Sequence, residues 1–438
     1  MTQARSLVLD NGLQVIIAET HASPVASVWV WYRVGSRCEH GSRTGLAHWV
    51  EHMLFKGSTR YPKGSVMRLV SQRGGYANAF TSHDYTSYYA TVASQHVGLV
   101  LDYEADRMTG ALFASEEVES ERTVILAEQS GGDNEPRQVL DDEVTATAFR
   151  YHPYRHQVIG LRDDLTRITR DDLYSFYRRF YVPSNAVLVV AGDVDAEETV
   201  RQVTATFGAL RGHAVPALEI PEEPEQLGER RLTLRLPGAA TLLDMAYRVP
   251  AVSHPDFVPL VVAAALLSGG RSIFSFGAGS SRSARLYRSV VEADLASSVD
   301  CDLQASLDPH LFSLGATVRQ GVSPEAVEQA MLKEIARLQD GLATAEEMSM
   351  AIRQTEAACA YASESVTSKA LTLGLAAMLG DIHRQETILQ ELREVTPEDV
   401  QRVASTYLVP ACRTVGWYLP VNDAGEPDDA CCVPGALS

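Results

Sequence analysis

Two segments of this chain repeat each other at a fixed offset of 227 residues. Residues 168–183 read ITRDDLYSFYRRFYVP, and residues 395–410 read VTPEDVQRVASTYLVP. In both copies a Thr that can cap a helix precedes an acidic first turn, a helix and a proline stop. Each copy then leads into an extended segment, AVLVVAGD at 186–193 and RTVGWYLP at 413–420. Generic helix–strand capping gives the same pattern and stays an alternative, but a repeat at about half the chain length favours two related domains.

The residues between the copies read as a linker. Residues 212–229 contain three prolines and five glutamates, which is typical of an extended, solvated segment. After it, RRLTLRLPG at 230–238 starts an alternating strand, much as ARSLVLDNG does at 4–12. Both halves mix such strands with helices, so we expect an α+β fold in which each domain is a mainly antiparallel sheet covered by helices. The expected divisions are a first domain at 1–211, the linker at 212–229, a second domain at 230–420 and a polar tail at 421–438.

The charge balance excludes several classes of partner. The 438 residues contain 38 Lys and Arg against 56 Asp and Glu, a formal net charge of −18. Because such a surface repels phosphate backbones and anionic lipid, we expect neither nucleic-acid binding nor membrane-surface binding. The longest uncharged apolar stretch, FVPLVVAAALL at 257–267, is too short to span a bilayer and predicts a buried helix.

The chain's start and its cysteines bear on its compartment. Residues 1–20 lack a basic start, an apolar stretch and a small-residue cleavage site, so no secretory signal is visible. Six cysteines form no disulfide framework and no CxxC knuckle. We expect a cytoplasmic protein, with a periplasmic one as the alternative if a signal has been trimmed.

The sequence TGLAHWVEHMLFKG at 44–57 carries candidate metal chemistry. Thr44 is a candidate cap for an otherwise apolar helix. His48 and His52 are four residues apart, so both imidazoles lie on one helical face and can reach one ion. Glu51 is close enough to both histidines to accept or donate a proton of a metal-bound water. A solvated polar face is the alternative, and it fits this apolar helix badly.

A zinc hydrolase site needs a third protein ligand and one open position. The candidate helix is SEEVESERTVILAEQSGG at 115–132, where Glu121 and Glu128 lie two turns apart on one face. Most acidic residues on such a helix are solvated, so these residues by themselves do not single out Glu128.

The motifs together resemble a known family. H-x-x-E-H is the inverted zincin motif, and Glu128 follows His52 by 76 residues within ERTVILAE. With GGYANAFTSHDYTSYYATV at 74–92 between them, these segments resemble the pitrilysin/insulinase family, the inverzincins. The resemblance covers nearly the whole chain, strongly over 10–195 and diffusely after 230. It implies paired homologous α+β domains of the processing-peptidase/LuxS-like metallohydrolase type.

The resemblance also implies roles for individual residues. His48, His52 and Glu128 correspond to the ligands of one Zn²⁺ per chain, and Glu51 corresponds to the general base. Glu121 matches a second acidic position of the catalytic site, which orients His52 or the water. The implied reaction is hydrolysis of a peptide bond by a zinc-bound water whose proton Glu51 takes and then returns to the leaving amine.

The segment at 74–92 implies a place for the substrate. By resemblance, the strand edge formed by Ala77, Asn78 and Ala79 pairs with the backbone of a peptide substrate. A role for Asn78 in the turn alone is the alternative. Three further histidines match no metal position and are expected to be structural or surface residues: His83, His152 and His156.

One segment departs from the family pattern. Active members carry an Arg and a Tyr after an R-L-Y/F segment in the second domain, and these groups stabilise the oxyanion and hold substrate. Here the expected Arg position falls near Val291 and the expected Tyr position near Ser297 or Ser298. We therefore expect this chain to resemble the zinc-bearing subunit of bacterial processing-peptidase-like heterodimers, with a homologous partner subunit that carries the Arg/Tyr pair. A homodimer in which Arg288 or Tyr287 substitutes is the alternative.

The sequence thus predicts a zinc-dependent endopeptidase that acts on peptides or unfolded segments. A non-catalytic assembly subunit of the same fold and a peptidase dedicated to one precursor are the alternatives. The Gly- and Ser-rich stretch at 269–283 lacks GxxxxGK[ST], so we interpret it as a flexible surface loop and not as a nucleotide site.

Overall fold

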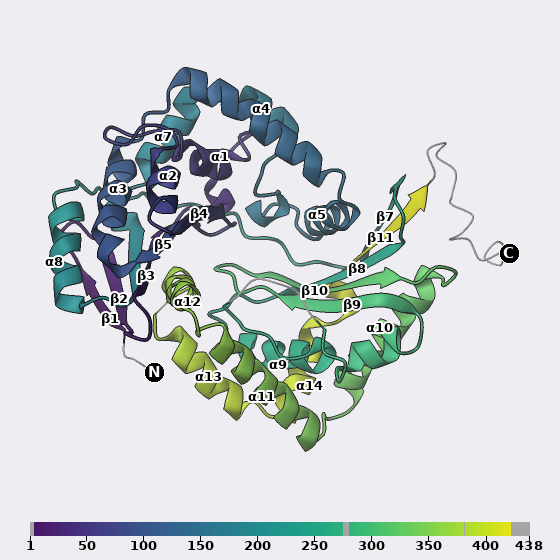
Figure 1. The fold of residues 1–438 in the computed structure, drawn as a ribbon. Coiled ribbons are helices and arrows are strands. Elements are labelled where there is room, and N and C mark those ends of the chain that lie inside the picture. Colours follow the sequence, from purple (N-terminus) through teal and green to yellow (C-terminus); the bar gives the residue numbers. More distant parts are fainter. Residues whose placement is uncertain (1–3, 275–279, 381, 422–438) are drawn as a thin grey trace. The chain divides into compact units, whose positions relative to one another are not determined.

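A computed structural model describes residues 4–274, 280–380 and 382–421. The chain divides into two compact units (Figure 1). Unit 1 consists of residues 1–131, 156–221 and 362–382, and unit 2 consists of residues 132–155, 222–361 and 383–438. The linker residues 212–229 form neither helix nor strand. Most of the expected tail, from residue 422 on, and residues 275–279 of the Gly- and Ser-rich stretch lie outside the described residues.

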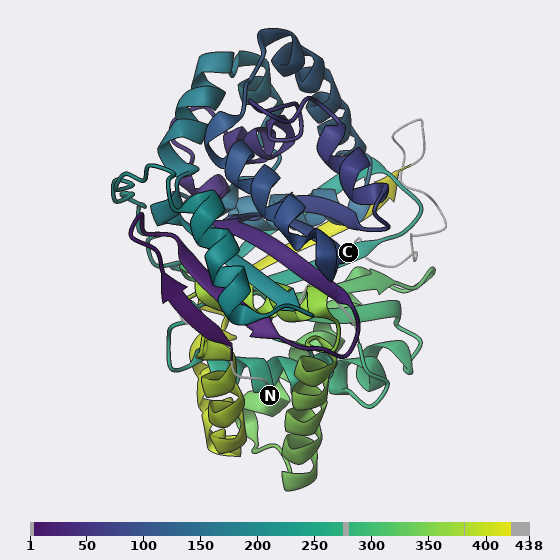
Figure 2. The same ribbon diagram turned by 60° about the vertical axis from the view of Figure 1, so that its left-hand side comes forward.

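Unit 1 is built on a six-stranded sheet. Its strands are β1 (Arg5–Val8), β2 (Gln14–Glu19), β3 (Val25–Tyr32), β4 (Tyr76–Thr81), β5 (Thr86–Ala93) and β6 (Ala186–Gly192). They lie in the order β1-β2-β6-β3-β5-β4, and every pair is antiparallel except β2 with β6. Strand β4 is therefore an edge strand. Figure 2 brings β1 and β2, at the opposite edge of this sheet, toward the viewer.

Helices cover both faces of this sheet. They are α1 (Leu46–Met53), α2 (Ser65–Ser71), α3 (Val97–Gly110), α4 (Ser115–Gly132), α6 (Arg162–Arg167), α7 (Arg170–Phe180), α8 (Ala196–Phe207) and α12 (Val366–Met378). In β3 the residues Val28, Val30 and Tyr32 join the main core with the helices, and because side chains alternate along a strand, Trp29 and Trp31 face the other way. Helix α12 lies on that second face, opposite α1, α2 and α7 (Figure 1).

Unit 2 repeats this topology with five strands. They are β7 (Arg230–Pro237), β8 (Leu242–Val249), β9 (Ala296–Leu303), β10 (His310–Val318) and β11 (Arg413–Val421), in the order β7-β11-β8-β10-β9. Only β7 and β11 are parallel, just as only β2 and β6 are in unit 1. Removing β1 from the first sheet leaves the same order of equivalent strands. The predicted α+β fold with two homologous sheets is confirmed.

The helices of unit 2 include the second copy of the repeat. They are α5 (Pro136–Ala148), α9 (Phe257–Ser268), α10 (Pro324–Asp340), α11 (Ala345–Tyr361), α13 (Arg384–Glu394) and α14 (Pro397–Tyr407). Helices α7 and α14 begin with the same capping box, formed by Thr169 with Asp172 and by Thr396 with Asp399. They lead into the equivalent strands β6 and β11, so the sequence repeat corresponds to a repeat of structure.

The short helices complete the described elements. The 3-10 helices are η1 (Ser36–Cys38), η2 (Ser94–His96), η3 (Pro153–Arg155), η4 (Pro183–Asn185) and η6 (Pro410–Cys412), and η5 (Tyr287–Val291) is a π-helix.

Each sheet is covered by one helix from the other half of the sequence. Helix α12 packs on β3 and β6 of unit 1, and α5 packs on the equivalent strands β8 and β11 of unit 2. A glycine lies at each contact: a Cβ on Gly374 would lie 2.1 Å from the indole nitrogen of Trp31, and one on Gly416 would lie 2.4 Å from a methyl of Val144. These close approaches explain how the helices lie flat on the sheets.

Helix α9 contains the apolar stretch that the sequence singled out. Eleven of its residues are buried, which confirms the prediction of a buried helix over 257–267. Over the described ranges, the structure contains no helix with the length and apolar character that crossing a bilayer requires.

Candidate metal centre and active site

Helix α1 carries the H-x-x-E-H motif, and a buried carboxylate fixes its start. The helix begins after Gly45, whose φ of 93° lies in the left-handed region that favours glycine. The backbone N–H groups of Gly45 and Ala47 donate to the two carboxylate oxygens of Glu39, each at 2.8 Å. Thr44 instead donates its hydroxyl to Asp164. The expected cap by Thr44 is therefore wrong, because Gly45 occupies the N-cap position and Glu39 supplies the acceptor.

Three predicted ligands come together although one of them lies far along the sequence. His48, His52 and Glu128 each present one ligand atom, and these atoms lie within 4.8 Å of one another. The two imidazole rings have centroids 4.5 Å apart, and Nε2 of His52 lies 3.7 Å from a carboxylate oxygen of Glu128. Within the described part of the chain this is the one such group of His, Cys, Asp and Glu side chains. His83, His152 and His156 do not join it.

Glu121 fixes the ring of His52. Its Oε1 accepts a hydrogen bond from Nδ1 of His52 at 2.8 Å, and Lys56 forms an ion pair with its other oxygen. Although burial raises the pKa of Glu121, its bonds with Lys56 and His52 lower that pKa more, so the group is held as a carboxylate. With Nδ1 protonated toward Glu121, the lone pair of His52 is on Nε2, the atom that faces Glu128.

The chemistry of the donor set fits a zinc ion. Burial, aided by the neighbouring His52, lowers the pKa of His48 to about 3, so its imidazole is neutral near pH 7. Its Nδ1 is buried and has no hydrogen-bond partner among the described residues. Two neutral imidazoles and one carboxylate are the ligands of a three-residue catalytic zinc site, which leaves a fourth position open. The side chain of Glu128 is half exposed, so the group of ligands is open to solvent on that side.

Glu51 lies on the same helix and is held from the edge of the sheet. The Thr81 hydroxyl at the end of β4 donates to Oε2 of Glu51 at 2.6 Å. Burial raises the pKa of Glu51, while the Thr81 hydrogen bond and the charges of His52 and Arg107 oppose that shift. A carboxylate with a raised pKa beside a metal-ligand group is suited to accept and return a proton.

Strand β4 contains the predicted substrate-binding residues. Ala77, Asn78 and Ala79 pair with Ala90, Tyr89 and Tyr88 of β5, and β5 is the only strand that pairs with β4 within the described chain. The free side of an edge strand offers backbone groups to an extended peptide. The Asn78 side chain accepts a hydrogen bond from the Ala79 N–H at 2.9 Å, so it shapes the strand and not a turn.

The sequence reasoning missed Lys56, Thr81 and Glu39. Lys56 lies three residues beyond the end of α1, so its ion pair with Glu121 depends on the turn that follows the helix. Thr81 is the last residue of β4, two positions after Ala79. For Glu39 we find no signal in the sequence, because its role depends on where its loop packs.

The segment that departs from the family pattern lies in unit 2. Arg285 is bound by two hydrogen bonds of 2.9 Å to Glu347, whereas Arg288 is exposed. Ser297 and Ser298 are exposed residues of β9, the edge strand of the second sheet.

The fold and the site together define a chain of two homologous α+β units with one candidate metal centre of the His–His–Glu type. Comparison with known families agrees. The model for "Insulinase (Peptidase family M16)" matches residues 14–161, and the model for "Peptidase M16 inactive domain" matches residues 167–355.

Individual relatives extend the match to nearly the whole chain. An uncharacterized zinc protease of Mycobacterium bovis is 32% identical over 411 residues, which cover 91% of this chain and 90% of that protein. A probable mitochondrial-processing peptidase subunit beta of Arabidopsis thaliana is 29% identical over 77% of this chain and 63% of its own length. Zinc protease PqqE of Helicobacter pylori is 33% identical over 61% of each chain.

The crystal structure of a protease from Helicobacter pylori superposes with a TM-score of 0.89 at 27% identity, covering 96% of this chain and 100% of that one. The chain belongs to peptidase family M16, the insulinase family.

Proposed function

We propose that this chain is a zinc-dependent endopeptidase that hydrolyses peptides or unfolded segments. The observation that carries the proposal is the convergence of His48, His52 and Glu128 within 4.8 Å, beside Glu51 on the same helix. Relatives that are named zinc proteases support it.

The residues of the chain have separate roles in this proposal. His48, His52 and Glu128 would hold the zinc ion, which when bound polarises a carbonyl and lowers the pKa of its water. Glu51 accepts the proton of the attacking water and returns it to the leaving amine. Glu121 keeps His52 in the required tautomer and orientation.

The edge strand supplies the place for the substrate. An extended peptide adds to the free side of β4 at Ala77, Asn78 and Ala79 through main-chain hydrogen bonds. Since such bonds do not depend on the side chains of the peptide, we expect tolerance of varied sequences. The Thr81 hydroxyl places Glu51 next to the end of the same strand.

We further propose that the active form is a heterodimer with a homologous chain that carries an Arg and a Tyr. The support is the sequence of this chain, which has Val291 near the expected position of the Arg and Ser297 and Ser298 near that of the Tyr. A relative whose name is that of a processing-peptidase subunit is consistent with such an assembly. A homodimer in which Arg288 or Tyr287 substitutes is the alternative.

The test combines zinc analysis with cleavage of a quenched fluorescent peptide library. The chain is assayed alone and with a homologous Arg/Tyr-bearing chain. We expect one zinc per chain and cleavage only in the mixture. Glu51→Gln should abolish cleavage and keep the zinc, whereas Glu128→Gln should lose the zinc and the exposed Glu116→Gln on the same helix should change neither.

The other outcomes have equally definite meanings. Cleavage by the chain alone would contradict the heterodimer and support the homodimer. One zinc per chain without cleavage in any mixture would contradict the peptidase and favour a non-catalytic assembly subunit.

A further inference from the structure

A buried ion pair lies in helix α3 of unit 1 and is not part of the proposed reaction. The side chains of Glu104 and Arg107 are 0% and 3% exposed. The guanidinium donates through Nε to Glu104 at 2.7 Å and through Nη2 to the other carboxylate oxygen. This two-point contact fixes the plane of the guanidinium.

Three aromatic rings surround that guanidinium. Its central carbon lies 4.1 Å from the ring centre of Tyr88, 5.1 Å from that of Tyr103 and 5.4 Å from that of Phe55. Rings at these distances attract a cation through their faces. Phe55 and Tyr88 also lie near each other, with centroids 6.0 Å apart. Arg107 therefore contacts Tyr103 on its own helix, Tyr88 on β5 and Phe55 in the turn after α1.

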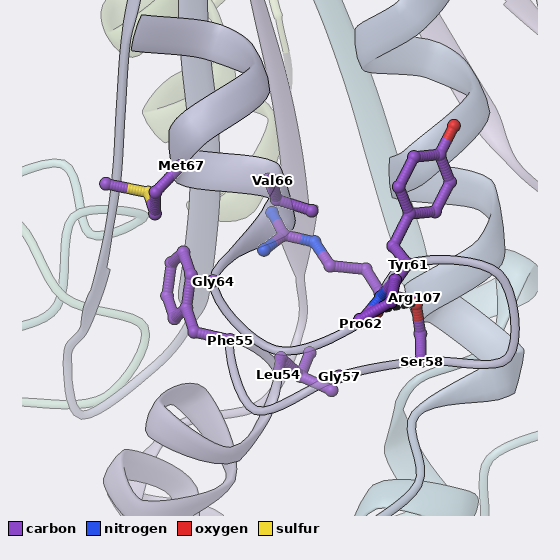
Figure 3. A pocket seen from close by; sticks show the side chains of 10 residues that line it. All are labelled: Leu54, Phe55, Gly57, Ser58, Tyr61, Pro62, Gly64, Val66, Met67 and Arg107. Carbon is purple, nitrogen blue, oxygen red and sulfur yellow. Dashed lines mark hydrogen bonds between the residues drawn. The ribbon is translucent and has the colours of Figure 1, made fainter.

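The third guanidinium nitrogen of Arg107, Nη1, takes no part in the contact with Glu104. This atom is buried and has no hydrogen-bond partner among the described residues. Arg107 lines a small pocket together with Phe55, Val66 and Met67 (Figure 3). In Figure 3 the guanidinium end of Arg107 lies between the loop that carries Phe55 and the helix that carries Val66.

Two of these contacts lead directly to the proposed active site. Phe55 follows His52 by three residues, in the turn directly after α1. Tyr88 is the register partner of Ala79 in the edge strand. Arg107 thus connects the helix that carries the metal ligands and Glu51 with the strand pair that would hold the substrate.

Stability alone gives no reason for this pair. Burying two charges costs solvation free energy, and apolar side chains of similar volume often serve a core equally well or better. A guanidinium differs from an apolar chain in having a fixed plane, which can stack on Tyr88 and Phe55 while Glu104 holds it.

We propose that Arg107, held by Glu104, is a positioning residue that fixes the end of α1 against β5 and thereby sets the placement of Glu51 relative to the substrate-binding edge of β4. This inference rests on the proposed peptidase function. A displacement of about 1 Å at a reacting group can lower a rate by about 10²-fold. We therefore expect even a small displacement of α1 relative to β4 to lower kcat.

The test replaces the pair and leaves the active-site residues intact. The variants are the double substitution Glu104→Gln/Arg107→Met and the single substitution Arg107→Lys. A matched control is Glu328→Gln/Arg231→Met in unit 2, which removes another ion pair with a buried carboxylate. Each protein, assembled with its partner if the wild type needs one, is measured for zinc content, thermal unfolding, kcat and KM. Hydrogen exchange is followed in peptides that cover residues 46–58 and 76–93.

We expect the double variant to bind one zinc, to keep KM within about threefold and to lose about 10²-fold in kcat. Its amides in 46–58 and 76–93 should exchange faster. Arg107→Lys should recover part of kcat, and the unit 2 control should keep kcat and both exchange profiles. A folded, zinc-bearing double variant with wild-type kcat overturns the inference.

Two further outcomes stay decisive. If the double variant does not fold, Arg107→Lys carries the test, and a wild-type kcat in that variant overturns the inference. If the wild type cleaves no peptide, the proposed function fails by itself. Exchange then decides about Arg107, since faster exchange confined to the two segments supports its positioning role and unchanged exchange rejects it.

Discussion

The hydroxyl of Thr81 donates a hydrogen bond of 2.6 Å to the carboxylate of Glu51, so the last residue of the edge strand holds the proposed general base. The two residues are 30 positions apart and belong to β4 and α1. This contact fixes the position of the carboxylate that would move the proton relative to the strand that would bind the peptide.

Substituting Thr81→Val should lower kcat/KM by about 10- to 150-fold, because a hydrogen bond to a charged group contributes about 1.5–3 kcal/mol and valine keeps the shape without the donor. Steady-state kinetics on a peptide cleaved by the wild type measure this. Thr81→Ser, which keeps the hydroxyl, should stay near the wild type. Equal rates for the valine and serine variants would show that Glu51 does not depend on this donor.

Removing the charge of Glu121 should weaken zinc binding. The carboxylate accepts from Nδ1 of His52 and is neutralised by Lys56, so Glu121→Gln loses an ionic contact that orients a ligand. Substitution of such supporting residues typically costs about 10–100-fold in metal affinity. Competition with a chromophoric chelator measures the affinity. Glu117 lies on the same helix as Glu121 and forms an ion pair with Lys63. The substitution Glu117→Gln removes that ion pair, serves as the control and should leave the zinc affinity unchanged.

A methyl group on Gly374 should destabilise unit 1. The added Cβ would lie 2.1 Å from the indole nitrogen of Trp31, a fully buried ring that cannot move aside. Overpacking of this kind costs about 1–3 kcal/mol, of which the better helix propensity of alanine returns about 1 kcal/mol. Urea denaturation should therefore show a net loss for Gly374→Ala. In contrast, Gly131→Ala in α4 has open space around the new Cβ and should be neutral or stabilising. A stabilised Gly374→Ala would contradict the close packing of α12 on β3.

The buried Asp244 should make stability depend on pH in a definite direction. Burial raises its pKa to about 8, although the charge of Arg137 opposes this shift. An unfolded aspartate has a pKa of about 3.9, so between about pH 4 and pH 8 the folded protein keeps a proton that the unfolded chain has released. The contribution of Asp244 to the free energy of unfolding therefore falls as pH rises through this window and is constant above it.

Asparagine cannot ionise, so Asp244→Asn should remove that contribution. The free energy of unfolding of the variant minus that of the wild type should increase from pH 5 to pH 8 and then level off. Urea titrations at four pH values between 5 and 9 measure the difference. The exposed Asp340→Asn is the control and should give a difference independent of pH. A constant difference for Asp244→Asn as well would mean that this carboxyl is ionised throughout.

The amino-acid sequence determined what depends on spacing within one element. A helix of 3.6 residues per turn places His48 and His52 on one face, and it does the same for Glu121 and Glu128. Likewise, Thr169 and Thr396 signal the start of equivalent helices, because a capping box involves only neighbouring residues. The resemblance to the family rested on these local patterns, and membership and fold followed it.

Contacts between elements were decided only by the tertiary structure. Three such contacts are the hydrogen bonds of Glu39 at the start of α1, the hydrogen bond from Thr81 to Glu51, and the packing of aromatic rings around Arg107. They join residues whose separation in the sequence follows no helix or strand periodicity. The assignment of α12 to unit 1 is of the same kind, since Gly374 has no local reason to meet Trp31. Local backbone geometry sets the direction of a side chain within its element. Which elements meet depends on the free energy of burying surfaces from distant parts of the chain, and that sum exists only in the folded protein.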